Sequence, residues 1–563
     1  MTDATGADKF TGPTPDNALR QADAESGPVL AADGTPLKKS LGRALRMQKI
    51  RALALIAPLL IFVLVSFIAP IADMLFRSVE NQIVSETLPR TTEALGSWDG
   101  EGMPSEDVFE AAYYDIFIAA ENRIHTRLGS RLNYELTGAS SLFRRSGRGL
   151  DDIGEVYQDQ FEDLDENWDE ARPWAEIMGS EDWIAAQEEW DAADEEGGMP
   201  RFQLREGAAT AFPNAAQAYL TFARFTQTED EDSPLEEEPW SMVHTALYQD
   251  LAAEDYASYD GPRAGMVQAA DELVASPDFQ TVTFADGFAE IDEDWATPEI
   301  WQTIKLYSPN YTSGYFLNAV DMQLTPDGAE ARDADEQIYL FLFKRTLFMS
   351  LVITFSCIAL GYPVAFLLSN LPMRTANVLM ILVLLPFWTS LLVRTSAWKV
   401  MLQQQGVIND VLVWLGLVAD DSRLVMINNQ FGTIVAMTHI LLPFMILPMY
   451  SVMSTIPPSY LRAAKSLGAT NWTAFWRVYF PQSIPGIGAG SILVFILSIG
   501  YYITPEIVGG TTGTFISNRI AYHISTSLNW GLAAALGSIL LVVVLLLYWA
   551  YDRIVGIDNV KLG

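Results

Sequence analysis

The sequence has 563 residues, a formal net charge of −35 and a mean hydropathy of +0.15, a combination that neither a soluble acidic protein nor a simple membrane protein explains. The charge is unevenly placed: residues 78–337 hold 57 acidic against 14 basic side chains, and the remaining chain holds 13 against 21. This distribution excludes a nucleic-acid-binding protein and predicts a membrane part that carries a large acidic insertion.

The N-terminal part predicts a tail, a surface helix and a first membrane span. Residues 1–36 are rich in Gly, Ala, Asp, Thr and Pro and lack apolar periodicity, so we expect a disordered cytoplasmic tail. Residues 37–51 hold six basic side chains and no acid, which predicts a basic amphipathic helix on the inner leaflet. Residues 52–77 predict transmembrane helix 1, an uncleaved anchor because no small-residue cleavage site follows it.

Residues 338–563 predict transmembrane helices 2 to 6, so the expected fold class is an all-α membrane protein with six spans. Basic residues near the spans place both termini in the cytoplasm and residues 78–337 outside. The six apolar runs have the length that a bilayer core requires: Ala52–Ala72, Thr346–Met373, Thr375–Val393, Leu424–Met453, Ile484–Thr504 and Gly531–Tyr551.

The insertion, residues 78–337, is too long for a loop, and the eight tryptophans spread through it argue against full disorder. Helix-like spacing at Val108–Leu136 and Trp174–Asp194 predicts a mostly helical domain, with flexible acidic stretches around 191–198 and 228–238. Its last part, 300–338, is expected to pack on the outer mouth. The acidity either concentrates a cationic solute or guides a binding protein, or it is a solvated surface suited to salty surroundings.

The loop at 454–483, between the fourth and fifth spans, carries the most informative pattern. It reads as two short helices joined at Gly468, because glycine takes a positive φ at no cost. Thr470 or Asn471 is expected to cap the second helix, and Pro481 to limit its continuation. The loop holds basic residues and no acid, which is typical of a cytoplasmic loop.

This loop resembles the EAA loop of ABC importer permeases, which docks on a cytoplasmic ATPase. Ala463, Ala464, Gly468 and Pro481 match the family pattern, whereas Arg462 stands where the family has an acidic residue. The resemblance therefore implies an ATPase-coupling loop, with these contact residues: Arg462, Ala463, Ala464, Lys465, Gly468 and Pro481.

Further segments are similar to the spermidine/putrescine-type branch of these permeases, whose members belong to the bacterial inner membrane. The segments are Leu385-Pro-Phe-Trp-Thr-Ser-Leu-Leu-Val-Arg394, Gly406-Val-Ile-Asn409, Ile440-Leu-Leu-Pro-Phe-Met445 and Tyr501-Tyr-Ile-Thr-Pro505. The resemblance implies the type I importer permease fold, a second permease subunit, two ATPase subunits and a periplasmic solute-binding protein. It also implies a small solute, with a polyamine such as spermidine or putrescine as the leading choice.

The chain has no phosphate-binding loop motif, so it is expected to be a transport subunit and not an enzyme, with ATP and Mg on the partner ATPase. No cofactor or metal site is expected, since the four histidines are dispersed. Candidates for the substrate path are Trp388, Thr389, Tyr501, Tyr502 and Glu506.

Each path candidate has a structural alternative. The aromatic residues could hold an alkylammonium by cation–π attraction or form an interfacial belt. Glu506 could meet a substrate amine or pair with Arg394, Arg519 or Lys344.

Alternative functions for the whole chain are an importer of another small organic solute, a membrane sensor with an external ligand-binding domain, and a membrane-bound enzyme. The last two leave the coupling loop unexplained.

Overall fold

The computed structural model describes residues 37–192, 198–253, 256 and 258–555. The tail predicted for residues 1–36 and the centre of the flexible stretch predicted around 191–198 lie outside these ranges. The chain divides into two units, one ending at Phe76 and the other beginning at Arg77.

The described residues of the first unit form one helical stretch that ends one residue beyond it: α2 (Leu37–Val63), a π-helical turn (Leu64–Ile68) and α3 (Ala69–Arg77). Residues 47–77 are apolar enough to cross a membrane, and none of their side chains is buried. The separate surface helix predicted for 37–51 is therefore continuous with the first span. No proline interrupts the chain between residues 37 and 57, so nothing ends the helix at the expected turn.

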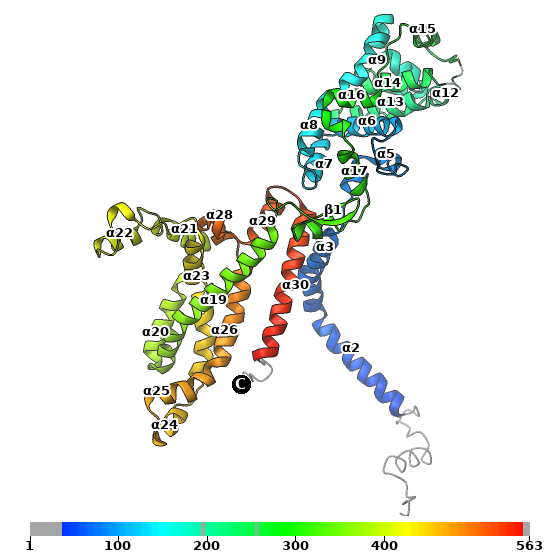
Figure 1. Cartoon of the computed structure of the whole chain (residues 1–563). Helices are drawn as coiled ribbons and strands as arrows, with labels where there is room; N and C mark the ends of the chain where they lie inside the picture. Colours follow the sequence, from blue (N-terminus) through cyan, green and yellow to red (C-terminus); the bar gives the residue numbers. More distant parts are fainter. Residues whose placement is uncertain (1–36, 193–197, 254–255, 257, 556–563) are drawn as a thin grey trace, which may run out of the picture. The chain divides into compact units, whose positions relative to one another are not determined.

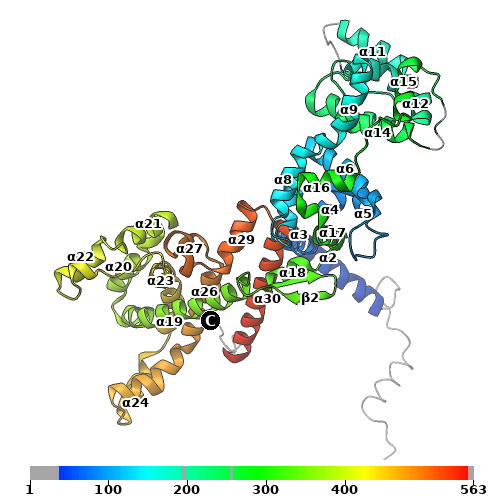
Figure 2. The same ribbon diagram turned by 45° about the horizontal axis from the view of Figure 1, so that its top comes forward.

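The membrane part of the second unit consists of long helices joined by short ones (Figures 1 and 2). Its helices are α19 (Tyr339–Asn370), α20 (Met373–Leu384), α21 (Leu391–Met401), α22 (Val407–Trp414), α23 (Gln430–Ser454), α24 (Pro458–Ser466), α25 (Asn471–Ala474), α26 (Phe480–Gly500), α27 (Ile503–Val508), α28 (Gly510–Gly513), α29 (Ile516–Ser525) and α30 (Trp530–Val555). Short 3₁₀ or π turns lie at Leu385–Trp388, Asp420–Ser422 and Phe475–Tyr479.

Helices α19, α23 and α26 form the centre of this part, since all three pack on one another. Their buried core is rich in methionine and isoleucine, and it includes the single cysteine, Cys357. Gly486 and Gly490 of α26 face α23 closely: an added Cβ at Gly490 would lie 3.1 Å from a backbone oxygen of Met445. Small residues at such positions let helices approach in a membrane.

In the described residues, five helices are long and apolar enough to span a membrane, and a bent pair brings the number to six. The bent pair is the predicted third span, which is not a single straight helix. It breaks after Trp388 and turns by 92° into α21. The break has a local cause: Pro386 lies in the 3₁₀ turn, Thr389 is extended, and the Ser390 side chain accepts the Val393 N–H and so begins a new helix.

The insertion is built of short helices around one large hydrophobic core. Five fully buried tryptophans lie in this core: Trp168, Trp174, Trp183, Trp295 and Trp301. The helices are α4 (Ile83–Thr87), α5 (Pro89–Ala94), α6 (Glu106–Glu121), α7 (His125–Leu132), α8 (Ala139–Gly149), α9 (Asp151–Leu164), α10 (Ala171–Met178), α11 (Glu181–Ala192), α12 (Glu206–Ala211), α13 (Pro213–Phe225), α14 (Ser241–Leu251), α15 (Ala264–Val274), α16 (Phe284–Ile291), α17 (Pro298–Leu306) and α18 (Gly314–Ala319), with short 3₁₀ or π turns at Glu166–Trp168, Thr226–Asp230 and Glu293–Ala296.

A small antiparallel hairpin, β1 (Met322–Thr325) and β2 (Gly328–Ala331), follows α18. No strand was predicted here, since the expected fold class is all-α. The turn depends on Gly328, which has a φ of +127°. The hairpin leads the chain back from the insertion into α19.

The insertion joins the membrane helices through buried polar contacts. The Asp321 carboxylate accepts the N–H groups of Ile338, Tyr339 and Leu340 at 2.8 to 3.0 Å and so caps the start of α19. Tyr315 of α18 packs in a core shared with α19 and α30. A Cβ on Gly531 would clash with the Tyr315 ring, which shows how closely α30 approaches it.

Candidate functional site

The loop after α23 forms the helix–turn–helix that the sequence predicts. Helix α24 ends at Ser466 with Leu467 as its C-cap, and the next residue, Gly468, has a φ of +89°. The Gly468 N–H donates to the Lys465 carbonyl at 3.0 Å, and the Ala469 N–H donates to the Ala464 carbonyl at 3.1 Å. This pair of bonds is a Schellman motif, and it needs a left-handed residue at Gly468. Thr470 then caps α25 by accepting the Thr473 N–H.

Pro481 does not end the second loop helix as the sequence analysis expected. Asn471–Gly500 is one continuous helical stretch, and Pro481 lies in the first turn of α26. A π-helical turn at Phe475–Tyr479 directly precedes it. A proline inside a helix clashes with the carbonyl four residues earlier, and the wider π turn gives this carbonyl room. The second loop helix is therefore part of the fifth span.

The outer surface of the loop combines positive charge with exposed apolar side chains. Arg462 and Lys465 are exposed on α24, and Leu467 is 89% exposed at its end. Trp472 is 72% exposed on the second helix. The side chains of Ala463 and Ala464 are small, so another protein could approach the backbone of the loop closely at these two residues.

A group of aromatic side chains fixes the inner side of the loop to α19. Phe475 packs edge-on against Tyr362 and Phe366, with ring centroids 6.2 and 5.6 Å away. The Tyr479 hydroxyl lies 3.1 Å from that of Ser369. A displacement of the loop therefore acts on both α19 and α26. These residues were not predicted from the sequence, although the dense aromatic run after Trp472 was a signal for them.

A second group of candidates lies where α26 gives way to α27. Tyr501 and Tyr502 occupy the break between these helices, and Glu506 is exposed on α27. Buried Asn518 of α29 joins them, because its amide nitrogen donates to the Tyr502 carbonyl at 2.9 Å and to the Glu506 carboxylate at 2.6 Å. Ser517 donates to the Tyr501 carbonyl at 3.0 Å.

Glu506 forms no ion pair within the part of the chain that the structure describes. Arg394, Arg519 and Lys344, the three cations considered as its partners, are all described residues. Asn518 therefore orients the carboxylate without neutralising it. Sequence reasoning missed Asn518, since a single asparagine at a helix start carries no functional signal of its own.

Trp388 and Thr389 lie at the bend of the third span. Trp388 is 75% exposed, and the Thr389 hydroxyl donates to the Pro386 carbonyl at 2.9 Å. The link from this span to the tyrosine–glutamate group runs through Thr395 of α21, whose hydroxyl lies 3.1 Å from that of Thr504. Of the five path candidates, Asn518 joins Tyr502 and Glu506, neighbouring Ser517 binds Tyr501, and Trp388 and Thr389 lie at the bend.

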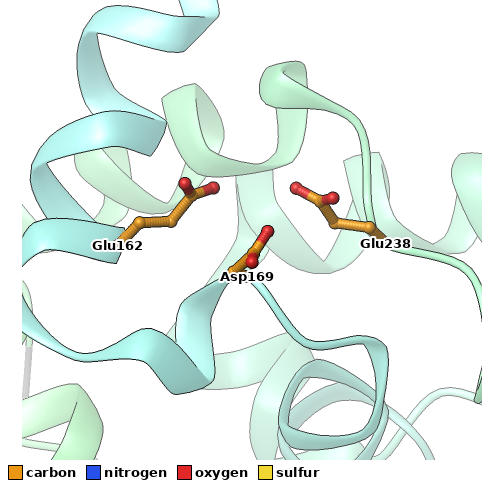
Figure 3. Close-up of side chains that lie close together, drawn as sticks. All are labelled: Glu162, Asp169 and Glu238. Atoms are coloured by element: carbon orange, nitrogen blue, oxygen red, sulfur yellow. The ribbon is translucent and has the colours of Figure 1, made fainter.

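The insertion contains a cluster of three carboxylates that the sequence analysis did not assign. Each of the three residues, Glu162, Asp169 and Glu238, contributes one carboxylate oxygen, and these three oxygens lie within 4.8 Å of one another (Figure 3). Burial, followed by the carboxylates of Asp169 and Glu162, raises the pKa of Glu238 to about 7. Gln158 also donates to Glu238 at 2.6 Å. The three negative carboxylates repel one another. A cation bound by the three oxygens could relieve this repulsion, and so could a proton shared between them.

The fold and these sites define a helical, multi-pass membrane transport subunit. Residues 344–555 match the family model described as "Binding-protein-dependent transport system inner membrane component". The spermidine/putrescine transport system permease protein PotB of Escherichia coli (strain K12) is 33% identical over 224 residues, which cover 39% of this chain and 81% of that protein. PotB of Salmonella typhi is also 33% identical, with 77% of that protein covered.

Two other proteins extend the comparison. The inner membrane ABC transporter permease protein YdcU of Escherichia coli (strain K12) is 31% identical over 263 residues, or 45% of this chain and 82% of that protein. A bacterial ABC transporter involved in the import of the acidic polysaccharide alginate matches in structure at 20% identity and a TM-score of 0.33, with 40% of this chain and 80% of that chain covered.

The chain belongs to the family of binding-protein-dependent transport system inner membrane components. It is an ABC importer permease subunit of the inner membrane. The family model matches residues 344–555 and so does not cover residues 78–337, the acidic insertion.

Proposed function

We propose that this permease subunit translocates a polyamine or a similar small organic cation. The observation that carries the proposal is the Glu506 carboxylate, exposed, free of ion pairs in the described chain, and held by Asn518 beside Tyr501 and Tyr502. A carboxylate in this setting attracts an ammonium group, and aromatic faces hold an alkylammonium at about 0.5 to 2 kcal/mol. The relatives named for spermidine and putrescine support the same choice of solute.

The proposed partners follow from the family and from the loop. A periplasmic binding protein delivers the solute, a second permease subunit completes the path, and two ATPase subunits carry ATP and Mg. The exposed, basic surface of residues 454–483 receives the motion of the ATPase. The aromatic contacts of Phe475 with α19 then pass this motion to the central helices, and the path switches from inward to outward opening. The N- and C-termini lie in the cytoplasm, and residues 78–337 lie in the periplasm.

Glu506→Gln tests the role of the carboxylate, because it keeps the shape and removes the charge. A charge-assisted hydrogen bond contributes about 1.5 to 3 kcal/mol. The concentration of labelled spermidine that gives half-maximal uptake should therefore rise about tenfold or more. Uptake is measured in vesicles that contain the whole complex. Glu330→Gln, an exposed carboxylate on β2, is the matched control and should leave uptake unchanged. An unchanged concentration dependence for Glu506→Gln would remove this residue from the path.

A further inference from the structure

A cavity of about 450 Å³ lies between the insertion and the start of the last membrane helix. The insertion contributes Arg127, Ser130 and Arg131 of α7 to its wall, and the membrane part contributes residues 527–531. The volume is in the range of small-ligand sites. Since α30 begins at Trp530 and is a membrane span, the cavity opens at the level of one membrane surface.

The wall of this cavity carries positive charge within a strongly acidic domain. Arg127 is exposed and forms no ion pair with a described residue. Arg131 is buried: its Nε donates to the Tyr315 hydroxyl at 2.8 Å and its Nη1 to Glu135 at 2.9 Å. Arg332 also pairs with Glu135, at 3.0 Å. Arg332 pairs in addition with the exposed Glu336, at 3.3 Å. The two arginines are therefore matched by two glutamates, and the charge that the described residues leave unpaired at the cavity is that of Arg127.

Two buried donors beside the cavity have no protein partner in the described chain. They are Nη2 of Arg131 and the amide nitrogen of Asn529, whose oxygen is used to cap α30 by accepting the Leu532 N–H. The cavity wall also includes two carboxylates, half-buried Glu80 and exposed Glu86, against three arginines, Arg77, Arg127 and Arg131. Unused donors beside an unpaired arginine favour a ligand that is anionic and rich in acceptor oxygens.

The rim of the cavity is apolar on the side of the membrane helix. Leu528 is 63% exposed and holds a φ of +53°, a conformation that costs a leucine free energy. Trp530 is 49% exposed directly at the start of the span. Tryptophan favours the headgroup level of a bilayer, and an exposed leucine beside it suits contact with acyl chains.

We propose that this cavity binds the phosphate group of an anionic phospholipid, with Arg127 as its direct contact and the unbonded Nη2 of buried Arg131 as a second donor behind it. The chemistry shared with free phosphate is the anion, and the apolar rim at Leu528 and Trp530 selects the lipid. Such a lipid would bridge α7 of the insertion and the start of α30. The proposal depends on the membrane assignment of α30 and is independent of the transported solute.

Native mass spectrometry of the full chain in detergent tests this proposal by titration with phosphatidylglycerol or phosphatidylcholine of the same acyl chains. We expect retention of phosphatidylglycerol and a loss of its binding of about fivefold or more in Arg127→Gln, the scale of one arginine at an anionic surface. Arg127→Lys should restore most of the binding. The control is Arg224→Gln, an exposed arginine on α13, which should bind as the wild type does.

Three results would overturn the proposal. Equal retention of the two lipids would show that the anion is not recognised. Unchanged binding in Arg127→Gln, in a variant that stays monodisperse and helical, would place the lipid elsewhere. Displacement of the lipid by millimolar inorganic phosphate would show that the cavity takes a soluble anion.

Discussion

Gly468→Val tests the turn of the coupling loop alone, because it changes the backbone conformation of the turn and no other contact of the loop. The glycine has a φ of +89°, and a Cβ built on it would meet no atom within 4 Å. The substitution therefore causes no clash, and its whole effect is on the backbone. Valine in the left-handed region costs about 2 kcal/mol, at the upper end for an L residue because its side chain is β-branched.

This cost is sufficient to change the conformation of the loop. A penalty of about 2 kcal/mol shifts an equilibrium about 30-fold. The turn is held by the bonds from Gly468 and Ala469 to carbonyls of α24, and these bonds are lost when φ becomes negative. Helix α24, with Arg462 and Lys465, then changes direction relative to α25. We expect substrate-stimulated ATP hydrolysis and uptake by the assembled complex to fall about tenfold or more.

The chain offers a matched control at the opposite end of α23. Gly416 ends α22 with the same motif: its φ is +69°, no atom lies within 4 Å of an added Cβ, and its N–H donates to Val413. Gly416→Val thus imposes a similar strain away from the loop and should largely preserve uptake. Gly468→Asn should be milder, since asparagine tolerates the left-handed region. Normal transport by Gly468→Val, or equal losses in both valine variants, would refute the coupling role.

Three further predictions concern topology, the junction and the acidic cluster. In a chain whose one native cysteine is buried, a cysteine at Asp278 should react with an impermeant thiol reagent from the periplasmic side, and one at Ser466 only after permeabilisation; the reverse pattern would contradict the proposed orientation. Asp321→Ala removes three hydrogen bonds at the start of α19 and should lower the free energy of unfolding by about 2 to 3 kcal/mol in denaturant titrations, whereas a change under about 0.5 kcal/mol would show that water replaces the cap. The pKa of Glu238 is raised from 4.5 to about 7, so its protonated form stabilises the fold below pH 4.5, and this contribution is lost as the pH rises through 7. Glu238→Gln should therefore stabilise the insertion above pH 7, by about 1 kcal/mol after solvent screening, and leave it unchanged near pH 4; tryptophan fluorescence measures the unfolding, and an equal effect at both pH values would contradict the shift.

The sequence predicted the membrane helices where length and apolarity decide the outcome. Five of the six runs correspond to long helices, whose ends differ from the predicted ones by several residues. The prediction of the third run as a single helix was wrong, because length and composition do not show where local side chains end a helix. Pro386 weakens the helix, and the Ser390 hydroxyl offers the next backbone N–H group an alternative partner.

The coupling loop shows the same division between local and distant causes. The turn at Gly468 was predictable, since glycine's positive φ and a helix end are local properties. The continuation through Pro481 was not, because it depends on a π turn that no simple pattern marks. Asn518, which holds Glu506, was invisible for another reason: the two side chains meet only when α29 folds back on α27.

The insertion illustrates what composition can and cannot provide. Buried tryptophans are what allow so acidic a segment to fold, and their number was readable from the sequence. The meeting of Glu162, Asp169 and Glu238 depends on the packing of separate segments, which composition does not reveal.

Reconstitution of the complete complex in liposomes tests the central claim most directly. The measurement is uptake of labelled spermidine with the binding protein outside and ATP inside. Our account predicts ATP-dependent accumulation of spermidine that requires the separate ATPase subunits and is not inhibited by small organic anions. ATP-dependent uptake of an anion with no uptake of spermidine or putrescine would contradict the proposed solute, and spermidine accumulation without the ATPase would contradict the importer mechanism itself.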